Sequence, residues 1–381
     1  MNVLVTGSKG FIGKNLVATL KNIIEGKERK YDFNSKLAIL EYDVDADPRL
    51  LEEYCRKCDF VINLAGVNRP DDEAEYMPEN FGFISTLIDT LMKYDNHCPV
   101  MFASSTQAVL DNPYGKSKKA GEDLVFKYAS ETGAEVYIYR LPNVFGKWCR
   151  PNYNSAIATF CFNIARGQPI KVSDRNVRMN LVYIDDVVEE FVNALSGKAN
   201  KKDDGYCYIP VKYTATLGEI VDLIYSFRAS REELDLPDLS DALTKKLYAT
   251  YISYLPENQF SYPLKMNTDS RGSFTEIIRT PDRGQFSVNI SKPGVTKGNH
   301  WHNTKFEKFL VVSGKGVIRF RKIDEDRIHE YYVDCKKLEV VDIPTGYTHS
   351  IENLGDTDMV TLIWANECYD PEKPDTFYLE V

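Results

Sequence analysis

Short apolar runs alternate with helix-like stretches through residues 1–254 of the chain. Several of these runs are apolar on both faces, which is typical of strands in a buried parallel sheet. We predict strands at Val3–Thr6, Leu37–Leu40, Phe60–Leu64, Val100–Ala103 and Val136–Arg140, and helices at Lys14–Lys21, Phe81–Lys93 and Lys116–Glu131. The repeated strand–helix order predicts an α/β Rossmann fold with a doubly wound parallel sheet.

The pattern changes from Phe274, where short alternating strands are separated by Gly and Pro turns. Examples are Phe286–Ile290, Lys308–Val312 and Gly316–Arg321. This pattern predicts an all-β barrel or sandwich. We place the linker near Leu255–Asn258, after a helical stretch, and therefore expect two domains, residues 1–254 and 255–381.

Composition and charge restrict the cellular compartment and the classes of partner that we expect for this protein. The 381 residues are 43% hydrophobic and 27% charged and carry a formal net charge of −9, with no basic block to attract nucleic acid. The eight cysteines are scattered without a disulfide framework. No apolar run reaches the length of a membrane span, and the chain enters a predicted strand at once instead of a signal peptide. We therefore expect a cytoplasmic protein that acts on neither nucleic acid nor membranes.

A glycine-rich loop follows the first predicted strand and precedes the first helix. Glycines at this place allow a tight turn, close approach of a pyrophosphate and close packing of helix on strand. The following helix offers its free N–H groups and positive dipole end to phosphates. The loop therefore predicts a dinucleotide site formed by Gly7, Lys9, Gly10, Phe11, Ile12 and Gly13.

A tyrosine and a lysine stand four residues apart on a predicted helix. Tyr114 and Lys118 therefore share one helix face, and an ammonium near a phenol lowers the phenol's pKa. Such a tyrosine can exchange a proton near neutral pH. A partner hydroxyl is expected from the end of the preceding strand, at Ser105 or Thr106. The alternative interpretation is an exposed Tyr–Lys pair without chemistry.

Cofactor preference stays open from the residues alone. Asp43 follows the second predicted strand, where a carboxylate accepts hydrogen bonds from ribose hydroxyls and repels a 2′-phosphate, favouring NAD. Lys9 in the glycine loop favours NADP instead, because its ammonium attracts that phosphate. Either charge can also be simply solvated.

Together with the segments Asn63–Gly66 and Arg140–Gly146, these motifs resemble the extended short-chain dehydrogenase/reductase family over residues 1–250. The resemblance implies that Tyr114 is the general acid or base and that Lys118 holds the nicotinamide ribose. It also implies a hydrogen bond from Ser105 or Thr106 to the substrate oxygen. Further contacts implied by this family are to the cofactor from Leu64, Ala65, Gly66 and Arg140, and to the substrate diphosphate from Asn143.

Three of the five histidines gather with one carboxylate in the C-terminal region. His300 and His302 are two residues apart, so on a strand both point to one face. Glu307 opens the next predicted strand, and His349 follows a Pro-x-Gly turn. Three imidazoles and one carboxylate are a ligand set for a divalent metal such as zinc. The alternative is a β-barrel with core histidines and no metal.

The spacing of these ligands resembles the signature of the cupins, which are β-barrels of jelly-roll type. The resemblance covers about the last 125 residues. One departure is that Leu338 replaces the glycine that opens the second cupin block. That glycine shapes a turn and is not a ligand.

The fusion of the two parts, with the segments 112–115, 152–155, 269–274 and 298–302, resembles a family of bacterial capsular polysaccharide synthesis enzymes over essentially the whole chain. This resemblance implies that the cupin epimerises C3 of a UDP-4-keto-6-deoxy-N-acetylhexosamine. The reductase domain would then reduce C4 with NADPH to UDP-2-acetamido-2,6-dideoxy-L-talose, a precursor of UDP-N-acetyl-L-fucosamine. It also implies a homodimer, a zinc ion in the cupin, NADP(H) rather than NAD(H), and a substrate contact from Asn154.

Two rival functions remain at this point. The first is a nucleotide-sugar reductase whose metal-bound cupin serves dimerisation or sugar binding without catalysis. The second is an Fe(II) dioxygenase cupin tethered to a reductase, since the ligand set suits iron as well. The base that removes the C3 proton is also open, with Glu276, Lys297 and Tyr347 as candidates.

Overall fold

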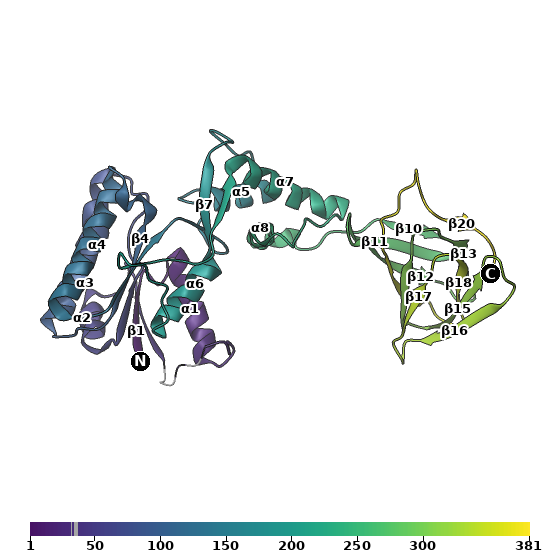
Figure 1. Ribbon diagram of the computed structural model, residues 1–381, viewed down its shortest axis with the longest axis horizontal. Helices are drawn as coiled ribbons and strands as arrows, with labels where there is room; N and C mark the ends of the chain where they lie inside the picture. Colours follow the sequence, from purple (N-terminus) through teal and green to yellow (C-terminus); the bar gives the residue numbers. More distant parts are fainter. Residues whose placement is uncertain (32, 34–36) are drawn as a thin grey trace. The chain divides into compact units, whose positions relative to one another are not determined.

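The computed structural model describes residues 1–31, 33 and 37–381 (Figure 1). Two compact units are present. The N-terminal unit comprises Met1–Ile224 and Ala242–Pro256, and the C-terminal unit comprises Tyr225–Asp241 and Glu257–Val381. The segment 225–241 is joined to the later strands by backbone hydrogen bonds, from Leu236 N to Arg279 O at 3.1 Å and from Arg279 N to Leu234 O at 2.8 Å. A single cut of the chain at residue 254 would divide this pairing.

The N-terminal unit confirms the predicted doubly wound sheet. Six strands pair in parallel in the order β2-β1-β3-β4-β5-β8. Their bounds are β1 Asn2–Thr6, β2 Ala38–Tyr42, β3 Phe60–Asn63, β4 Val100–Ser105, β5 Val136–Leu141 and β8 Tyr206–Cys207. Each of the five predicted strands is present, with ends shifted by two residues or fewer. Most side chains of β1, β3, β4 and β5 are buried, as the apolar runs required, whereas β2 has no buried residue.

Helices cover both faces of this sheet (Figure 1). On one face α1 and α6 pack with the strands in one hydrophobic cluster, and on the other α2, α3 and α4 form a second cluster. The helices are α1 Phe11–Ile24, α2 Pro48–Lys57, α3 Phe83–Lys93, α4 Pro113–Thr132 and α6 Ile184–Leu195. Short 3-10 helices lie at Glu73–Glu75, Thr106–Val109 and Glu257–Gln259, and a π-helix lies at Met77–Gly82.

A smaller sheet and further helices complete the sequence up to residue 256. The order of the small sheet is β6-β7-β9, with β6 parallel and β9 antiparallel to β7. These elements are β6 Asn143–Phe145, β7 Arg178–Tyr183, β9 Tyr213–Thr216, α5 Ala156–Ala165, α7 Leu217–Glu233 and α8 Ala242–Ile252. The predicted helical stretch before the linker corresponds to α8.

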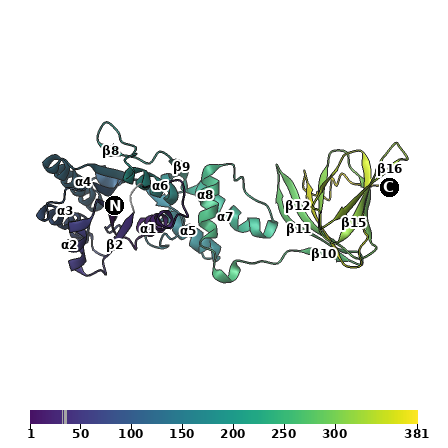
Figure 2. The same cartoon turned by 90° about the horizontal axis from the view of Figure 1, so that it is seen from below.

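The C-terminal unit contains the end of α7 and two antiparallel sheets, β10-β11-β12-β19-β14-β17 and β16-β15-β18-β13-β20 (Figure 2). The strands begin at Met266, earlier than predicted, and run β10 Met266–Asp269, β11 Gly272–Thr280, β12 Gly284–Ser291, β13 Thr296–Trp301, β14 Glu307–Ser313, β15 Lys315–Lys322, β16 Ile328–Asp334, β17 Val340–Ile343, β18 Tyr347–Asn353, β19 Met359–Ala365 and β20 Phe377–Tyr378. Residues such as Phe309, Ile318 and Ile351 form the core between the sheets.

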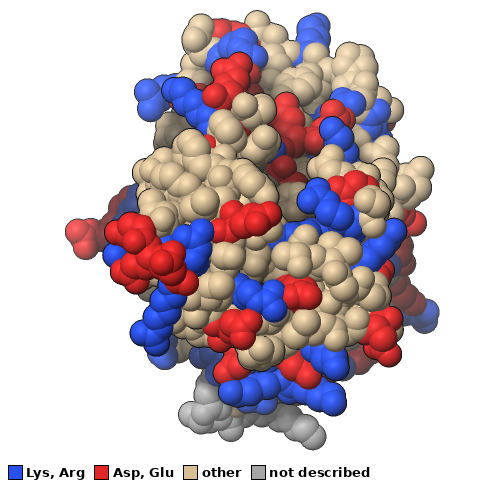
Figure 3. Space-filling view, turned by 90° about the vertical axis from the view of Figure 1, so that its right-hand side faces the viewer, with Lys and Arg blue, Asp and Glu red and all other residues tan. Residues whose placement is uncertain are grey.

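On the face in Figure 3, acidic and basic side chains are interspersed instead of forming a basic field. Among the described residues, no helix combines the length and the apolar character that crossing a bilayer requires.

Candidate functional site

A cavity of about 760 Å³ opens at the carboxyl ends of the parallel strands in the N-terminal unit. This is the place where ligands bind in doubly wound sheets. Fourteen of the residues predicted for cofactor, substrate or catalysis line it: Gly7, Lys9, Gly10, Phe11, Ile12, Gly13, Leu64, Gly66, Ser105, Thr106, Tyr114, Lys118, Asn143 and Asn154. The lining does not include Asp43, Ala65 or Arg140.

The glycine loop leaves no space for side chains at two positions. Gly7 has φ +65°, and a Cβ there would lie 2.8 Å from the backbone of Leu64 and Ala65. A Cβ on Gly13 would lie 2.1 Å from the carbonyl oxygen of Gly7. The loop therefore packs directly on the neighbouring strand end, and α1 starts at Phe11 with its first N–H groups facing the cavity mouth.

Tyr114 lies at the start of α4, on the cavity wall. Pro113 occupies the first turn, and the Asn112 side chain caps the helix by accepting from Gly115 N at 2.7 Å. The Tyr114 hydroxyl donates to Asn68 Oδ1 at 2.8 Å. Burial raises the pKa of Tyr114 to about 12, although its hydrogen bond with Ser105 acts in the opposite direction. The phenol is thus held protonated in the absence of ligands.

Lys118 lies one helical turn further along and is buried. Its Nζ donates to Ala103 O at 3.2 Å and lies 6.0 Å from the centre of the Tyr114 ring. Burial lowers the pKa of Lys118 to about 8, while Glu122 acts to raise it. The pair predicted from spacing alone therefore faces one cavity. The pKa of Tyr114 is raised and that of Lys118 is lowered, so the two values move apart. The predicted lowering of the phenol pKa is wrong, because burial of the Tyr114 hydroxyl outweighs it.

The two candidate hydroxyls differ in their surroundings. Ser105 is 8% exposed, and its Oγ accepts from Gln107 N at 3.1 Å while interacting with the Tyr114 hydroxyl. Thr106 also lines the cavity but is exposed. Of the two, Ser105 is the one whose oxygen contacts the tyrosine.

Sequence reasoning missed two asparagines beside Tyr114. Asn80 is buried on the π-helix Met77–Gly82, where it accepts from Val67 N at 2.9 Å and donates to Val67 O at 3.1 Å and Ser117 Oγ at 3.0 Å. These bonds fix the loop after β3 against α4 and so place Asn68 at the Tyr114 hydroxyl. The sequence signal at Asn80 was weak, because we predicted a regular helix only from Phe81.

Asp43 and Lys9, which were predicted to decide cofactor preference, are joined by a hydrogen bond and also have other partners nearby. Asp43 Oδ2 accepts from Lys9 N at 2.7 Å, and its other oxygen accepts from Val44 N at 2.8 Å. The Lys9 ammonium forms an ion pair with exposed Asp45. The positive charge of Lys9 is therefore offset by the negative charges of Asp43 and Asp45.

Arg140, which was predicted to contact the cofactor, does not line the cavity. Its guanidinium binds both carboxylate oxygens of Glu122, at 2.8 Å and 2.5 Å, and the hydroxyl of Tyr206 at 2.8 Å. Glu122 is fully buried and also accepts from Ser104 Oγ at 2.6 Å. Arg140 thus neutralises a buried carboxylate on α4. Its position in the chain did not predict this stabilising role.

This ion pair gives a prediction. Arg140→Ala leaves Glu122 buried without its cation, so we expect a loss of about 3 kcal/mol in the free energy of unfolding. Cofactor affinity of the folded variant should be unchanged, because Arg140 does not line the cavity. Urea unfolding and a cofactor titration measure the two quantities. A large loss of cofactor affinity with normal stability would instead support a contact between Arg140 and the cofactor.

Two asparagines on the far side of the cavity were predicted to contact substrate. Asn143 Nδ2 donates to Asn180 O at 3.1 Å, which joins β6 to β7. Asn154 lies in the exposed turn before α5. Both line the cavity, together with Arg150 and Tyr153, which sequence analysis did not name.

The C-terminal unit brings its four predicted ligands together. One ligand atom from each of His300, His302, Glu307 and His349 lies within 4.8 Å of the others. His300 and His349 are directly paired on β13 and β18, and a register shift between Gly298 and His300 precedes them. His302 follows β13 and Glu307 begins β14.

The chemistry of this cluster fits a divalent cation. His302 and His349 are each 1% exposed, yet His302 Nε2, both ring nitrogens of His349 and Glu307 Oε2 have no hydrogen-bond partner. Burial acts to raise the pKa of Glu307, but the histidines outweigh it and hold that pKa well below its usual range. Buried polar atoms that converge without partners need a further group between them, and this donor set suits zinc.

Fold and cavity together define a nicotinamide-dependent enzyme of the short-chain dehydrogenase/reductase type. The family model described as "NAD dependent epimerase/dehydratase family" matches residues 3–206, and "Polysaccharide biosynthesis C-terminal domain" matches residues 267–377. The chain belongs to the NAD dependent epimerase/dehydratase family, and the first of these models covers more than half of it.

Full-length relatives narrow this class. The chain is 54% identical to the capsular polysaccharide assembling protein CapF from Staphylococcus aureus, with a TM-score of 0.92 and 100% of both chains covered. It is 41% identical to the UDP-2-acetamido-2,6-beta-L-arabino-hexul-4-ose reductase of Pseudomonas aeruginosa, over 100% of this chain and 99% of that protein. A UDP-glucose 4-epimerase from Thermotoga maritima shares the fold at 20% identity and a TM-score of 0.52. The resemblance to capsular polysaccharide synthesis enzymes is therefore confirmed.

Proposed function

We propose that the protein is a bifunctional UDP-sugar enzyme. Its C-terminal unit, a zinc cupin, epimerises C3 of a UDP-4-keto-6-deoxy-N-acetylhexosamine. Its N-terminal unit then reduces C4 with NADPH to UDP-2-acetamido-2,6-dideoxy-L-talose. The observation that carries this proposal is that one chain, similar over its whole length to a named hexul-4-ose reductase, assembles both a Tyr–Lys–Ser cavity and a His3Glu cluster.

The reduction follows from the side chains around the cavity. When bound, the nicotinamide supplies the hydride that C4 receives. Tyr114 donates its hydroxyl proton to the C4 oxygen, which becomes the new alcohol, while Ser105 hydrogen-bonds the same oxygen. The Lys118 ammonium stabilises the tyrosinate left behind, and bulk solvent returns the proton afterwards. Asn68 Oδ1 accepts a hydrogen bond from the Tyr114 hydroxyl, and a ketone oxygen of the substrate would replace it as the acceptor.

The proposed metal is held by His300, His302, Glu307 and His349. When bound, zinc supplies a positive charge for polarising substrate oxygens, or holds the barrel's loops in place. The histidine ligands must be neutral to bind it, and burial with the two neighbouring imidazoles lowers the pKa of His300 to about 4. His300 is therefore neutral at neutral pH without the metal's help.

Epimerisation has to precede reduction for a chemical reason. The C3 proton is acidic only while C4 is a ketone, because the enolate delocalises the charge.

Among the candidate bases, Glu276 forms a two-bond ion pair with Arg279 at 2.5 and 2.7 Å. Lys297 Nζ donates to Asn289 Oδ1 at 2.8 Å and Ile290 O at 2.7 Å. Tyr347 packs against the hydrophobic core. Ligating histidines cannot serve as the base.

The most direct test supplies the 4-keto-6-deoxy UDP-sugar with NADPH in D2O and follows the sugar by NMR. The proposal expects deuterium at C3 and loss of the ketone, with NADPH consumed in proportion. Ketone loss without deuterium would favour the reductase with a non-catalytic cupin. Neither deuterium incorporation nor NADPH consumption would reject the proposal.

The lysine pKa gives a pH dependence. Lys118 is charged below a pKa of about 8 and neutral above it, so its support of the tyrosinate is present below that pH and lost above it. We expect kcat/KM for ketone reduction, which reports on the free enzyme, to fall as pH rises through about 8.

Two variants sharpen this pH prediction. In Lys118→Arg the guanidinium keeps its charge, so any remaining activity should lose the alkaline limb. The exposed Lys116→Arg on the same helix is the matched control and should keep the wild-type profile. A wild-type kcat/KM that stays flat up to pH 10 would contradict the assignment of Lys118.

A further inference from the structure

The C-terminal tail of the chain lies along β13, the strand that carries His300 and leads directly to His302. Strand β20 pairs with β13, matching Tyr378 with His300 and Phe377 with Trp301. Leu379 N extends this pairing by donating to Asn299 O at 3.0 Å. Residues from the last eight positions therefore form part of the wall around the ligand cluster.

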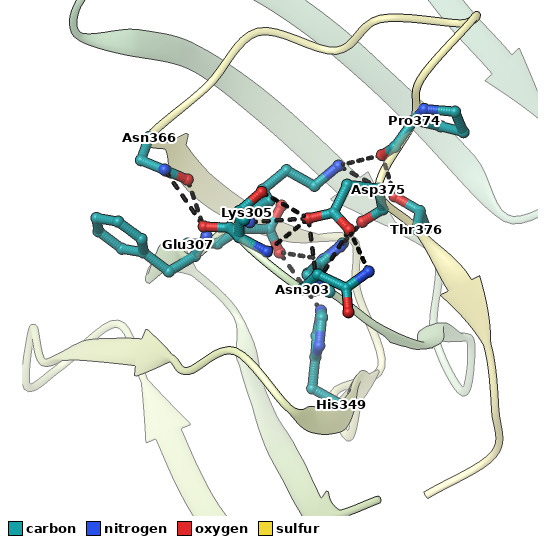
Figure 4. A network of polar contacts seen from close by, with 11 residues as sticks. Asn303, Lys305, Glu307, His349, Asn366, Pro374, Asp375 and Thr376 are labelled. Atoms are coloured by element: carbon teal, nitrogen blue, oxygen red, sulfur yellow. Dashed lines mark hydrogen bonds and ion pairs between the residues drawn. The ribbon is translucent and has the colours of Figure 1, made fainter.

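One carboxylate in this tail holds the loop between His302 and Glu307 (Figure 4). The Asp375 oxygens accept from five donors on three consecutive residues: Asn303 N at 3.0 and 3.1 Å, Asn303 Nδ2 at 3.0 Å, Thr304 N at 2.8 Å, Thr304 Oγ1 at 3.2 Å and Lys305 N at 2.9 Å. Asp375 itself has φ +41°, an unfavourable backbone conformation for a non-glycine residue. So many bonds to one side chain fix both the tail and the loop.

The backbone of the same residue orients a ligand. His302 Nδ1 lies 2.5 Å from Asp375 O. A carbonyl oxygen can only accept, so Nδ1 must carry the proton, and the lone pair is left on Nε2. That atom has no hydrogen-bond partner and lies 3.7 Å from Glu307 Oε2. Partners of this kind set the tautomer and ring orientation of metal-binding histidines.

The side chain of Lys305, in the same loop, also binds the tail. Lys305 is 7% exposed, and its Nζ donates to Pro374 O at 2.9 Å and to Thr376 Oγ1 at 3.0 Å (Figure 4). Next to it, Phe306 N donates to Asn366 Oδ1 at 2.8 Å. The loop that connects two ligands is thus tied at both ends to segments that follow β19.

We propose that residues 374–376 belong to the metal centre, with Asp375 as the positioning residue for His302 and for the loop 303–306. Docking of the tail and binding of the cation are then coupled, and each strengthens the other by the same factor. This inference rests on the proposed function only in requiring that the cluster binds a divalent cation. It is independent of the sugar and of the nicotinamide.

The test measures zinc affinity of the full-length chain by competition with a chelating dye. Asp375→Ala is expected to bind zinc about 10–100-fold more weakly than wild type, as losses of outer partners usually do. Asp375→Asn keeps the shape and the backbone carbonyl but removes the charge, so its affinity should fall between the two. Glu372→Gln is the matched control on the exposed part of the tail and should leave affinity unchanged.

A second measurement does not depend on any variant folding. Hydrogen exchange of residues 374–379 in wild type should slow when zinc is added, because the coupling is reciprocal. Equal zinc affinity of wild type and both Asp375 variants, or tail exchange that zinc does not change, would overturn the inference. A wild-type chain that binds no zinc would instead overturn the proposed metal centre itself.

Discussion

Tyr114→Phe is expected to lower kcat for reduction of the 4-keto sugar by about 10²–10⁴-fold, the usual contribution of a positioned proton donor. The hydroxyl is the group that faces the cavity between Ser105 and Asn68, and burial keeps it protonated. Phenylalanine preserves the ring and its contact with Tyr76, whose ring centre lies 5.5 Å away. The loss should therefore appear in kcat, with NADPH affinity retained.

Steady-state kinetics with the 4-keto UDP-sugar and a fluorescence titration with NADPH separate the two effects. Tyr225→Phe is a suitable control, since that side chain is 44% exposed and does not line the cavity. Tyr114→Phe should still exchange deuterium at C3, because we assign that step to the C-terminal unit. Normal turnover of NADPH by Tyr114→Phe would remove the basis of the proposed reduction.

His302→Ala is expected to weaken zinc binding by more than about 100-fold, because changes to outer partners alone cost about 10–100-fold. It should also abolish deuterium exchange at C3 while leaving NADPH affinity intact. The physical reason is that the buried Nε2 of His302 and the orphaned atoms of Glu307 and His349 converge on one point. Removing one donor leaves three ligands and an unfilled space in a dry site.

Metal analysis, NMR exchange in D2O and a cofactor titration measure these three quantities. His329→Ala is the matched control, because His329 is exposed on β16 and takes no part in the cluster. Unchanged exchange at C3 despite lost zinc would favour the reductase with a non-catalytic cupin. Oxygen uptake on addition of Fe(II) to wild type would favour a dioxygenase instead.

The residues that sequence analysis placed well are those whose partners are near in the chain or follow a fixed period. Tyr114 and Lys118 face one cavity because helix geometry puts positions i and i+4 on one side. Gly7 and Gly13 lie where the loop meets the strand, because no side chain fits there. The four metal-ligand candidates converge because alternation along strands points them inward.

Other interactions depend on partners that lie far apart in the chain, and some involve residues that sequence analysis did not name. Arg140 was assigned to the cofactor by its motif, whereas its actual partner is Glu122 on α4, which comes earlier in the chain. Asn68 and Asp375 stand in irregular segments, where no periodicity predicts direction. Asp375 meets residues 303–305 only because β20 pairs with β13, a contact that spans some seventy positions.

The sequence by itself determined the two fold classes, the strand and helix periods, the glycine turn and the chemical character of both sites, because these follow from local geometry and from which side chains must be buried. The tertiary structure alone decided which hydroxyl meets Tyr114, which group neutralises Glu122, and that the segment 225–241 joins the C-terminal unit. Those outcomes depend on packing and hydrogen bonds between residues far apart in the chain. No local pattern encodes them, since many pairings satisfy the same periods and only the packed chain selects one.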